Sequence, residues 1–358
     1  MTIGIIVHPY GEAHPAGLER FVRAATHALI NASPEHSFVI YSKRPIADVA
    51  RYPSHQCQFI SFNYDWLWVD RTLRRSPQAD CYIYWTPVMP IVYARKKNIV
   101  FVLDFSYQTM PAHGFKNTFV RTMLHFVHQR SIRKADRVIA ISRATKDEII
   151  RLGIRPTSEI SVIYPGYTEP SISVGTHALT RSPYILFVGA LKERKNVHGI
   201  IQGYARIAKE FPELSLLLVG HGGGTYAEKC KNIAQSLGIA DKIQFLGQVG
   251  DEELGLLYRN ATMLAYPSFV EGFGFPILEA MSLGVPVLTS SVGALKEVAE
   301  GSAVLVDPLD VASIASGMRS LLTDTQLRMS LVKSGKARVQ NFSWEHFARA
   351  LRDVISTL

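Results

Sequence analysis

Two carboxylates, Glu271 and Glu279, flank a glycine-containing loop in the stretch P-S-F-V-E-G-F-G-F-P-I-L-E. Gly272 and Gly274 carry no side chain, so the backbone of this loop can approach a ligand closely. Pro276 predicts the start of a short helix, because proline is favoured at the first helical position. A strand, a glycine loop and a helix N-terminus together predict an anion site, with both carboxylates facing the bound group.

A second loop, in F-V-G-A-L-K-E-R-K-N, brings Lys192, Arg194 and Lys195 between a predicted strand and a predicted helix. Cations beside a helix N-terminus can neutralise a diphosphate where no metal does so. A basic loop is also typical of an ordinary solvated surface. Its position favours the binding interpretation, because doubly wound sheets bind ligands at the loop ends of their parallel strands.

Short apolar runs predict the strands that must hold these loops, and helical spacing of apolar residues separates many of them. Strands alternating with helices imply parallel, doubly wound sheets. The predicted strands are Ile3 to Val7, Ser37 to Tyr41, Gln58 to Phe62, Cys81 to Trp85, Ile99 to Leu103, Val138 to Ile141, Ile160 to Tyr164, Tyr184 to Val188, Leu214 to Val219, Ile243 to Leu246, Thr262 to Pro267, Val285 to Ser290 and Ala303 to Val306.

The periodic pattern is lost in residues 165–183, which collect proline, glycine, serine and threonine, and then restarts. This composition predicts an interdomain connection. We therefore expect an N-terminal Rossmann-like domain over residues 1–166, a second Rossmann-like domain over residues 167–340, and a C-terminal helix over residues 341–358.

The chain has 358 residues, of which 47% are hydrophobic, enough for two domains with separate cores. No run approaches the roughly 20 apolar residues that span a bilayer. The three cysteines, Cys57, Cys81 and Cys230, are isolated from one another, which favours a reduced, cytoplasmic setting.

The excess of positive charge lies in the first half of the chain. Residues 1–165 carry 21 Lys and Arg against 12 Asp and Glu, whereas residues 166–358 carry 18 of each. The excess is densest between Asp80 and Asp136, where Asp104 is the only acid. Such a field attracts an anionic membrane surface, a polyanion or a phosphorylated substrate, and composition does not choose among them. Nucleic acid is the least favoured, because no nucleic-acid-reading motif accompanies the charge.

Several segments resemble retaining glycosyltransferases of family 4, especially the mannosyltransferase-like branch of that family. They are Y-P-G, F-V-G-A-L-K-E-R-K-N, L-Y-R-N-A, Y-P-S-F-V-E-G-F-G-F-P-I-L-E-A-M-S-L-G-V-P-V and A-V-L-V-D-P-L-D, with a weaker match in A-D-R-V-I-A-I-S-R-A-T-K. The resemblance covers the second domain nearly end to end. It implies the GT-B fold: two Rossmann-like domains facing across a cleft, the donor bound mainly by the second, the acceptor mainly by the first, and a C-terminal helix crossing back.

The resemblance assigns roles to both carboxylates. Glu279 matches the family glutamate that hydrogen-bonds the nucleotide ribose, and Glu271 matches the one beside the donor sugar. The backbone amides of Phe273, Gly274 and Phe275 would then contact sugar hydroxyls and phosphate. The competing interpretations are a helix-dipole partner for Glu279 and a loop cap for Glu271.

Lys195 matches the family lysine on the donor diphosphate, and Gly189 lies in the same donor-binding loop. Ala190 stands where the family often has an arginine, so Arg194 is expected to supply the second charge. In the first domain, A-G-L-E-R resembles a loop that approaches the donor phosphate. Gly17 is the expected point of close approach there, although a turn glycine without a ligand is the alternative.

The sequence departs from the mannosyltransferase-like pattern at F-V-L-D-F. Leu103 stands in place of a histidine that contacts the donor sugar, whereas Asp104, its neighbour, is kept. Either the sugar is held differently or another group, such as His113, reaches the sugar. An exposed loop histidine is the alternative for His113.

No D-x-D motif or His/Cys cluster with ligand spacing occurs, so we expect no metal and no cofactor beyond the nucleotide sugar itself. Lys195, Arg194 and helix N-termini would stabilise the leaving diphosphate. Front-face departure and attack is the favoured mechanism. A covalent intermediate on Glu271 is disfavoured because no second carboxylate is placed as acid/base.

Residues 115–137 predict a basic helix with apolar residues at Phe119, Val120, Met123, Leu124 and Val127. It can lie on an anionic leaflet, where a polyprenyl-linked acceptor would be found, or pack on the core with a solvated basic face. Both interpretations stay open. The expected location is the cytoplasm, with peripheral contact to the inner face of the plasma membrane under the first interpretation.

The sequence therefore predicts a retaining hexosyltransferase that uses GDP-mannose and a cell-surface glycan or lipid-linked saccharide acceptor. Alternatives are a UDP-sugar donor, a phosphorylase or epimerase with the same fold, and a non-catalytic nucleotide-sugar-binding partner of another transferase.

Overall fold

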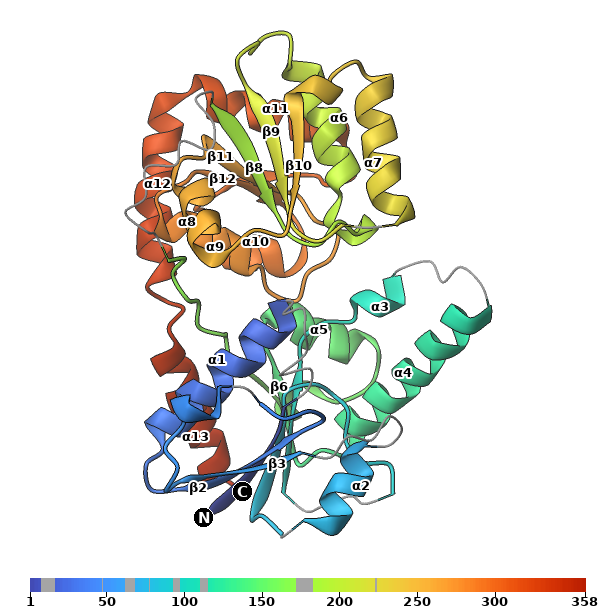
Figure 1. Cartoon of the computed structure of the whole chain (residues 1–358), viewed down its shortest axis with the longest axis vertical. Coiled ribbons are helices and arrows are strands. Elements are labelled where there is room, and N and C mark those ends of the chain that lie inside the picture. The colour runs from blue at the N-terminus through green and yellow to red at the C-terminus, as the bar shows by residue number, and fades with distance from the viewer. Residues whose placement is uncertain are drawn as a thin grey trace. The chain divides into compact units, whose positions relative to one another are not determined.

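The computed structural model divides the chain into two compact units (Figure 1). Unit 1 comprises Met1–Gly166 and Phe342–Leu358, and unit 2 comprises Tyr167–Asn341. The structure describes residues 1–7, 17–46, 48–61, 68–76, 78–92, 97–109, 115–171, 183–222 and 224–358. Most of the predicted interdomain connection, residues 172–182, lies outside the described residues.

Unit 1 contains a seven-stranded parallel sheet with strand order β3-β2-β1-β4-β5-β6-β7. Its central strands are buried along their length because helices cover both faces, which explains their continuous apolar runs. The strands are β1 (Thr2–Val7), β2 (Ser37–Ser42), β3 (Cys57–Ser61), β4 (Cys81–Tyr84), β5 (Asn98–Val102), β6 (Arg137–Ala140) and β7 (Ile160–Val162).

The helices of unit 1 include one from the far end of the chain. They are α1 (Gly17–Ala32), α2 (Trp68–Arg75), α3 (Ser106–Thr109), α4 (Phe115–Lys134), α5 (Arg143–Arg151) and α13 (Trp344–Ser356). Helix α13 packs against α1, with the rings of Phe347 and Phe21 6.2 Å apart. Phe347 also contacts Trp85 and Phe101, so the last helix completes the aromatic core of this unit.

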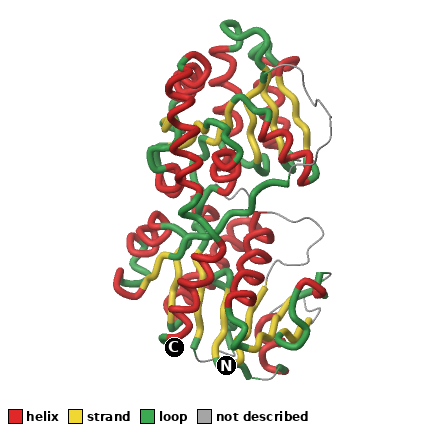
Figure 2. Tube along the Cα trace, turned by 90° about the vertical axis from the view of Figure 1, so that its left-hand side faces the viewer, coloured by secondary structure: helices red, strands yellow, loops and turns green. Residues whose placement is uncertain are grey.

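Unit 2 contains a six-stranded parallel sheet with strand order β10-β9-β8-β11-β12-β13. Figure 2 shows the strands of each unit running side by side between helices. The strands are β8 (Tyr184–Val188), β9 (Ser215–Val219), β10 (Ile243–Gly247), β11 (Met263–Tyr266), β12 (Val287–Ser290) and β13 (Val304–Val306).

Helices cover this second sheet as in a doubly wound fold. They are α6 (Val197–Ile207), α7 (Thr225–Ser236), α8 (Asp251–Arg259), α9 (Phe275–Ser282), α10 (Gly293–Ala299), α11 (Val311–Thr323) and α12 (Thr325–Val339). Each strand predicted from the sequence is present within about two residues of its expected bounds. The helix predicted to open at Pro276 begins one residue earlier and is followed by Gly284 in a positive-φ conformation.

In the part of the chain that the structure describes, every helix is too short or too polar to cross a bilayer.

Candidate active site

The loops that carry the candidate residues of unit 2 lie at the switch point of its sheet. Strand β8 is central: the chain adds β9 and β10 on one side of it and then β11, β12 and β13 on the other. The loops after β8 and β11 therefore leave adjacent strands at the carboxyl edge of the sheet, which is where doubly wound sheets bind their ligands. Arg194 and Lys195 follow β8, and Glu271 follows β11.

Arg194 and Lys195 lie in a short 3₁₀ turn, Glu193–Lys195, between β8 and α6. Asn196 ends this turn in the left-handed conformation with φ of 56° and is buried. Its side-chain amide donates to the carbonyls of Pro267 and Pro308, at 3.1 and 2.7 Å. The first bond ties the cationic turn to the loop after β11, and the second ties it to the loop after β13.

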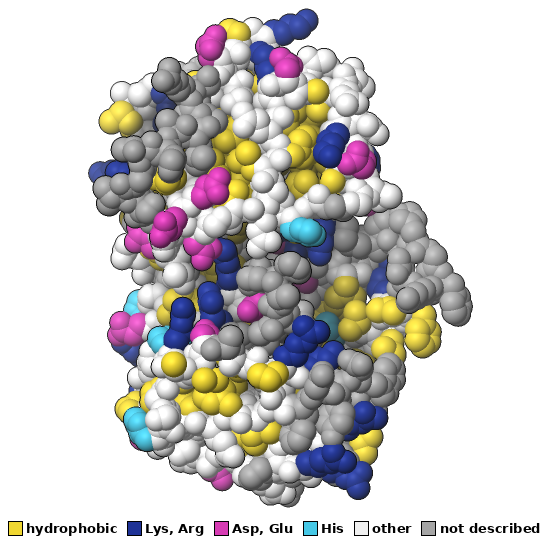
Figure 3. Space-filling model, viewed as in Figure 1, with side chains coloured by type: hydrophobic (Ala, Val, Ile, Leu, Met, Phe, Trp, Pro, Cys, Tyr) yellow, Lys and Arg dark blue, Asp and Glu magenta, His cyan; other side chains and the backbone are white. Residues whose placement is uncertain are grey.

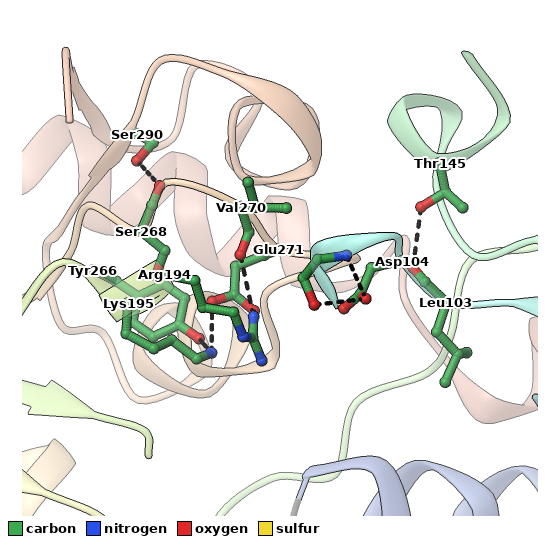
Figure 4. A network of polar contacts seen from close by, with 11 residues as sticks. Leu103, Asp104, Thr145, Arg194, Lys195, Tyr266, Ser268, Val270, Glu271 and Ser290 are labelled. Carbon is green, nitrogen blue, oxygen red and sulfur yellow. Dashed lines mark hydrogen bonds and ion pairs between the residues drawn. The ribbon is translucent and has the colours of Figure 1, made fainter. Parts of the chain in front are cut away.

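Glu271 receives both cations (Figure 4). Its Oε1 lies 2.6 Å from Nζ of Lys195, and its Oε2 accepts a hydrogen bond of 2.9 Å from Nη1 of Arg194. Arg194 also donates to the carbonyl of Val270, at 3.1 Å. The Glu271 and Lys195 side chains are only 8% and 10% exposed and that of Arg194 is 21% exposed, so the three groups form a largely buried charged cluster.

Burial and pairing act on the pKa of Glu271 in opposite directions. Burial raises the pKa, but the Lys195 ammonium and the Arg194 guanidinium outweigh burial and lower it below its ordinary value. The carboxylate is therefore ionised at neutral pH. One anion shared by two cations leaves the cluster with positive charge, which suits it to a second anionic group.

Tyr266, at the end of β11, is a second partner of Lys195. Its phenolic oxygen accepts a hydrogen bond from Nζ at 2.5 Å, and Nζ lies 4.9 Å from the ring centroid. Burial, with the neighbouring Glu271 carboxylate, raises the pKa of this phenol well above its ordinary value. The phenol is thus neutral, and its hydrogen bond helps to fix the position of the lysine.

The glycine loop and α9 have the predicted conformation. Gly274 is the N-cap of α9 with φ of +122°, a value that residues with a side chain rarely adopt. A Cβ there would lie 2.8 Å from Cδ2 of Leu295, so a larger residue would have to displace that side chain as well as strain the backbone. The Phe273 side chain is buried, and its ring lies edge-on 5.2 Å from that of Phe275. These contacts fix the backbone at the helix N-terminus.

Glu279 lies in the second turn of α9, apart from the cluster at Glu271. Its Oε2 accepts a hydrogen bond of 2.6 Å from the hydroxyl of Tyr258, a fully buried residue of α8. The two carboxylates of the motif thus have different partners: Glu271 is held by cations and Glu279 by a phenol. Gly189, at the end of β8, has φ of +154° and would place a Cβ within 3.7 Å of Cε of Lys195.

The candidate residues of unit 1 are described only in part. Gly17 is the first residue of α1, and the loop before it, residues 8–16, lies outside the described residues, as does His113. Oδ1 of Asp104 accepts hydrogen bonds from the backbone amide and hydroxyl of Ser106, at 3.0 and 2.8 Å, and so caps the start of α3. Leu103 accepts at its carbonyl from the hydroxyl of Thr145, at 3.1 Å (Figure 4).

Within the described ranges, no group of three or more His, Cys, Asp or Glu side chains is arranged to hold a metal ion.

Two family models match the chain, one over each unit. The model described as "Glycosyl transferases group 1" matches residues 173–338, and that described as "Glycosyltransferase Family 4" matches residues 15–168. O-antigen chain mannosyltransferase B of Escherichia coli is 31% identical over 281 residues, covering 74% of this chain and 71% of that protein. The chain therefore belongs to the glycosyltransferases of group 1 and family 4 that these two models describe.

A second relative of this glycosyltransferase has a similar name. O-antigen chain mannosyltransferase RfbU of Salmonella typhimurium is 28% identical over 251 residues, covering 67% of this chain and 69% of that protein. The crystal structure of HepE from Anabaena in complex with UDP and glucose has a TM-score of 0.78 and 19% identity, over 99% of each chain. This likeness, with the two parallel sheets, confirms the fold class GT-B.

The structure adds site residues of the glycosyltransferase that sequence reasoning did not assign. Tyr266, Tyr258 and Asn196 all lie within the motifs quoted above, in A-Y-P-S, L-Y-R-N-A and E-R-K-N. Each is buried and hydrogen-bonded to a candidate residue or to the loop that carries one. For Tyr266 the sequence did contain a signal: a tyrosine at the end of an apolar strand is expected to be buried, and a buried phenol requires a polar partner.

Proposed function

We propose that this glycosyltransferase is a retaining hexosyltransferase that moves mannose from GDP-mannose to a cell-surface glycan or lipid-linked saccharide. The observation that carries the proposal is the buried cluster of Lys195, Arg194 and Glu271 at the switch point of unit 2. Two fixed cations beside a carboxylate suit a donor that carries a diphosphate next to a sugar.

The two named relatives support mannose, because both are called O-antigen chain mannosyltransferases. The alternative is a UDP-sugar, since the HepE structure was solved with UDP and glucose. Leu103 also favours considering this alternative. The mannosyltransferase-like branch has a histidine at this position that contacts the donor sugar, and leucine cannot make that contact.

In the proposed reaction the bond between the anomeric carbon and the diphosphate oxygen breaks, and the acceptor hydroxyl forms a new bond on the same face. The proton of that hydroxyl passes to the departing phosphate oxygen, which accounts for retention without a second carboxylate. Lys195 and Arg194 would stabilise charge on the leaving diphosphate. Glu271 would face the positive charge that develops at the anomeric carbon.

We propose that the ribose of the nucleotide binds Glu279, and that the backbone at Phe273, Gly274 and Phe275 binds the sugar hydroxyls and phosphate. Gly189 allows the diphosphate to approach the backbone beside Lys195. Gly17 and Asp104 are the proposed donor contacts of unit 1. The capping bonds from Ser106 fix the orientation of the Asp104 carboxyl group that such a contact would use.

We assign no role to a metal, because Lys195 and Arg194 would supply the positive charge that neutralises the diphosphate. We therefore expect turnover to survive removal of divalent ions. Assays with and without EDTA check this, and a rate restored only by added Mg²⁺ or Mn²⁺ would require a metal in the mechanism.

The decisive experiment offers the protein a panel of GDP-, UDP- and ADP-sugars with a cell-envelope acceptor extract. We expect transfer from GDP-mannose above all, and donor-induced thermal stabilisation. Glu271→Gln and Lys195→Ala should lower transfer at least a hundredfold, whereas Lys231→Ala, which removes an exposed ion pair with Glu228, should not. Failure of every donor to bind would overturn the proposal, and binding without transfer would favour a non-catalytic partner.

A further inference from the structure

Helix α6 begins directly after the cationic turn, Glu193–Lys195, and its first N–H groups need an acceptor from elsewhere. An α-helix leaves the N–H groups of its first turn without partners inside the helix, and the N-cap side chain usually accepts from one of them. Here the N-cap is Asn196, whose side chain makes no capping bond; its amide donates instead to the carbonyls of Pro267 and Pro308. The start of α6 therefore depends on another element.

The hydroxyl of Tyr226, in α7, supplies the missing acceptor. The backbone N–H of His198, the second residue of α6, donates to it at 3.3 Å, and Nδ1 of the His198 ring lies 2.9 Å from it. The two rings are edge-on, with centroids 6.0 Å apart. The buried Cys230, one turn further along α7, also contacts this hydroxyl. One phenol of α7 thus holds both the backbone and the side chain of a residue in the first turn of α6.

The protonation states of these groups suit the arrangement at neutral pH. Burial raises the pKa of the Tyr226 phenol, and it raises the pKa of the Cys230 thiol to about 11, so both groups stay protonated. Burial, and after it the Lys229 ammonium, lowers the pKa of His198 against the opposing effect of Glu193. The imidazole is therefore neutral, and its Nδ1 can accept the proton that the hydroxyl donates.

Helix α7 lies alongside α6 and also contacts the first residue of the cationic turn (Figure 1). Nζ of Lys229, one turn after Tyr226, lies 3.4 Å from Oε1 of Glu193. These two side chains are 50% and 43% exposed, so their ion pair contributes little beside the hydroxyl. Charges of both signs lie on the outward side of α7, where Glu228 pairs with Lys231, and Figure 3 shows such charges at the position that α7 has in Figure 1. The side that carries Tyr226 faces α6.

The start of α6 is coupled to both loops of the candidate active site. Only two residues separate Lys195 from His198, so a shift of the helix start also shifts the backbone of the lysine. The ring of His198 lies 6.0 Å from that of Phe269, in the loop that carries Glu271. The backbone N–H of Phe269 donates in turn to the carbonyl of Arg194, at 2.8 Å. A fixed His198 therefore supports the two cations from both loops.

We propose that Tyr226 is a positioning residue for the donor: its hydrogen bonds to His198 hold the cationic turn where the two cations meet the diphosphate. The inference rests on the role proposed above for Lys195 and Arg194. It extends the donor-binding machinery to a hydroxyl of α7, a helix that carries none of the residues assigned to the site.

The test compares the affinity of the full chain for a nucleoside diphosphate and for the matching monophosphate, by isothermal titration calorimetry. GDP with GMP is the first pair, and UDP with UMP is the second. We expect the unmodified chain to bind the diphosphate more tightly. Tyr226→Phe should lower the ratio of the two affinities by about fivefold to tenfold, the range of one hydrogen bond, because the ring stays while the cap is lost. Monophosphate affinity should stay within about twofold of the original.

Tyr204→Phe is the matched control. Tyr204 is a fully buried tyrosine of the same helix α6, six residues after His198, and its hydroxyl donates to the carbonyl of Leu214 at 2.5 Å. This variant also loses a buried hydrogen bond, so it should lose comparable stability in thermal unfolding, but it should keep the affinity ratio. A purely structural role of Tyr226 would move both variants alike.

Two changes at His198 test the same contact from the other side. His198→Leu removes the acceptor in the ring and should lower the affinity ratio, whereas His198→Asn offers a side-chain oxygen to the hydroxyl and should keep it. An unchanged ratio in Tyr226→Phe, an equal fall in Tyr204→Phe, or equal ratios in the two His198 variants would overturn the proposal. An unmodified chain that binds neither diphosphate more tightly than its monophosphate would overturn the proposed role of the cations as well.

Discussion

The partners of Lys195 explain how a buried ammonium group is stabilised in this fold. Its charge is matched by Glu271, and it also donates a hydrogen bond to the phenol of Tyr266 at the end of β11. Removing one member of a buried charged cluster leaves the others desolvated and unpaired, which costs more than the interaction itself contributes. Tyr266 is the neutral member, so its hydroxyl can be removed with the charges intact.

We predict that Tyr266→Phe lowers kcat by about tenfold to a hundredfold, the range that one hydrogen bond to a charged group supports. The ring stays to fill the core against Phe187, so the fold should be kept. KM for the donor should change much less, because Lys195 keeps its charge but loses its fixed position. Steady-state kinetics with the preferred donor check this, and a rise in KM at constant kcat would assign Tyr266 to ground-state binding.

The cations also set the pH range of the site. Because the folded-state pKa of Glu271 is lowered, the ionised carboxylate adds stability above its unfolded value, and this stability is lost as pH falls through the lowered pKa. Arg194→Gln removes one of the two lowering charges. We expect the acid limb of kcat/KM to move to higher pH in this variant.

Lys192→Gln is the matched control for this shift. Lys192 is an exposed cation of the same loop, and the cations that lower the pKa of Glu271 are Lys195 and Arg194. Its acid limb should stay where the unmodified enzyme has it. Identical acid limbs for all three proteins would show that ionisation of another group sets this limb.

At this scale the sequence identified the charged residues but not their partners. Glu271, Lys195 and Arg194 were assigned from motif and spacing, and the structure brings the three together. Tyr266 and Tyr258 were not assigned, because a strand tyrosine looks the same whether its hydroxyl faces a lysine or a carbonyl. The bonds that Asp104 makes to Ser106 were equally hidden, since Asx caps depend on local backbone geometry.

The elements were easier to predict, because parallel strands covered on both faces have continuous apolar sequences. The helix start at Pro276 followed from the same kind of local rule. Strand order did not follow: nothing in the sequence placed β11 beside β8, and that neighbour relation is what brings the two site loops together. The surface of α4 was also undecided, because apolar spacing alone does not tell whether the apolar side faces the core or a lipid surface.

The loop before α9 is the element on which the site depends most. We predict that Gly274→Ala destabilises the protein by about 2–3 kcal/mol, because alanine is strained at φ of +122° and its Cβ meets Leu295. Donor affinity should fall as well. Gly250→Ala is the control, since Gly250 precedes α8 at an ordinary φ of −69° with open space around it. It should cost below about 1 kcal/mol.

Urea unfolding and donor-induced thermal shifts check both glycine variants. Equal stability of Gly274→Ala and Gly250→Ala would show that the α9 loop relaxes and does not require glycine.

At the scale of the whole molecule, unit 1 is discontinuous in sequence and is completed by its last helix. Helix α13 supplies Phe347 to an aromatic core that includes Phe21, Trp85 and Phe101. Unit 2 is a continuous segment with its own sheet and its own core. A change in α13 should therefore weaken the first unit and leave the donor site of the second intact.

We predict that Phe347→Ala destabilises unit 1 by about 3–5 kcal/mol, the range for removing a fully buried phenylalanine. Arg349→Ala, two residues along α13, breaks only an exposed ion pair with Glu345 and should cost below about 0.5 kcal/mol. Calorimetry should show the transition of unit 1 moving to lower temperature in the Phe347 variant alone, while the transition that GDP-mannose stabilises stays in place. A single transition that is lowered by Phe347→Ala and raised by GDP-mannose would give a different result. It would show that the two units unfold as one cooperative structure and that α13 stabilises both.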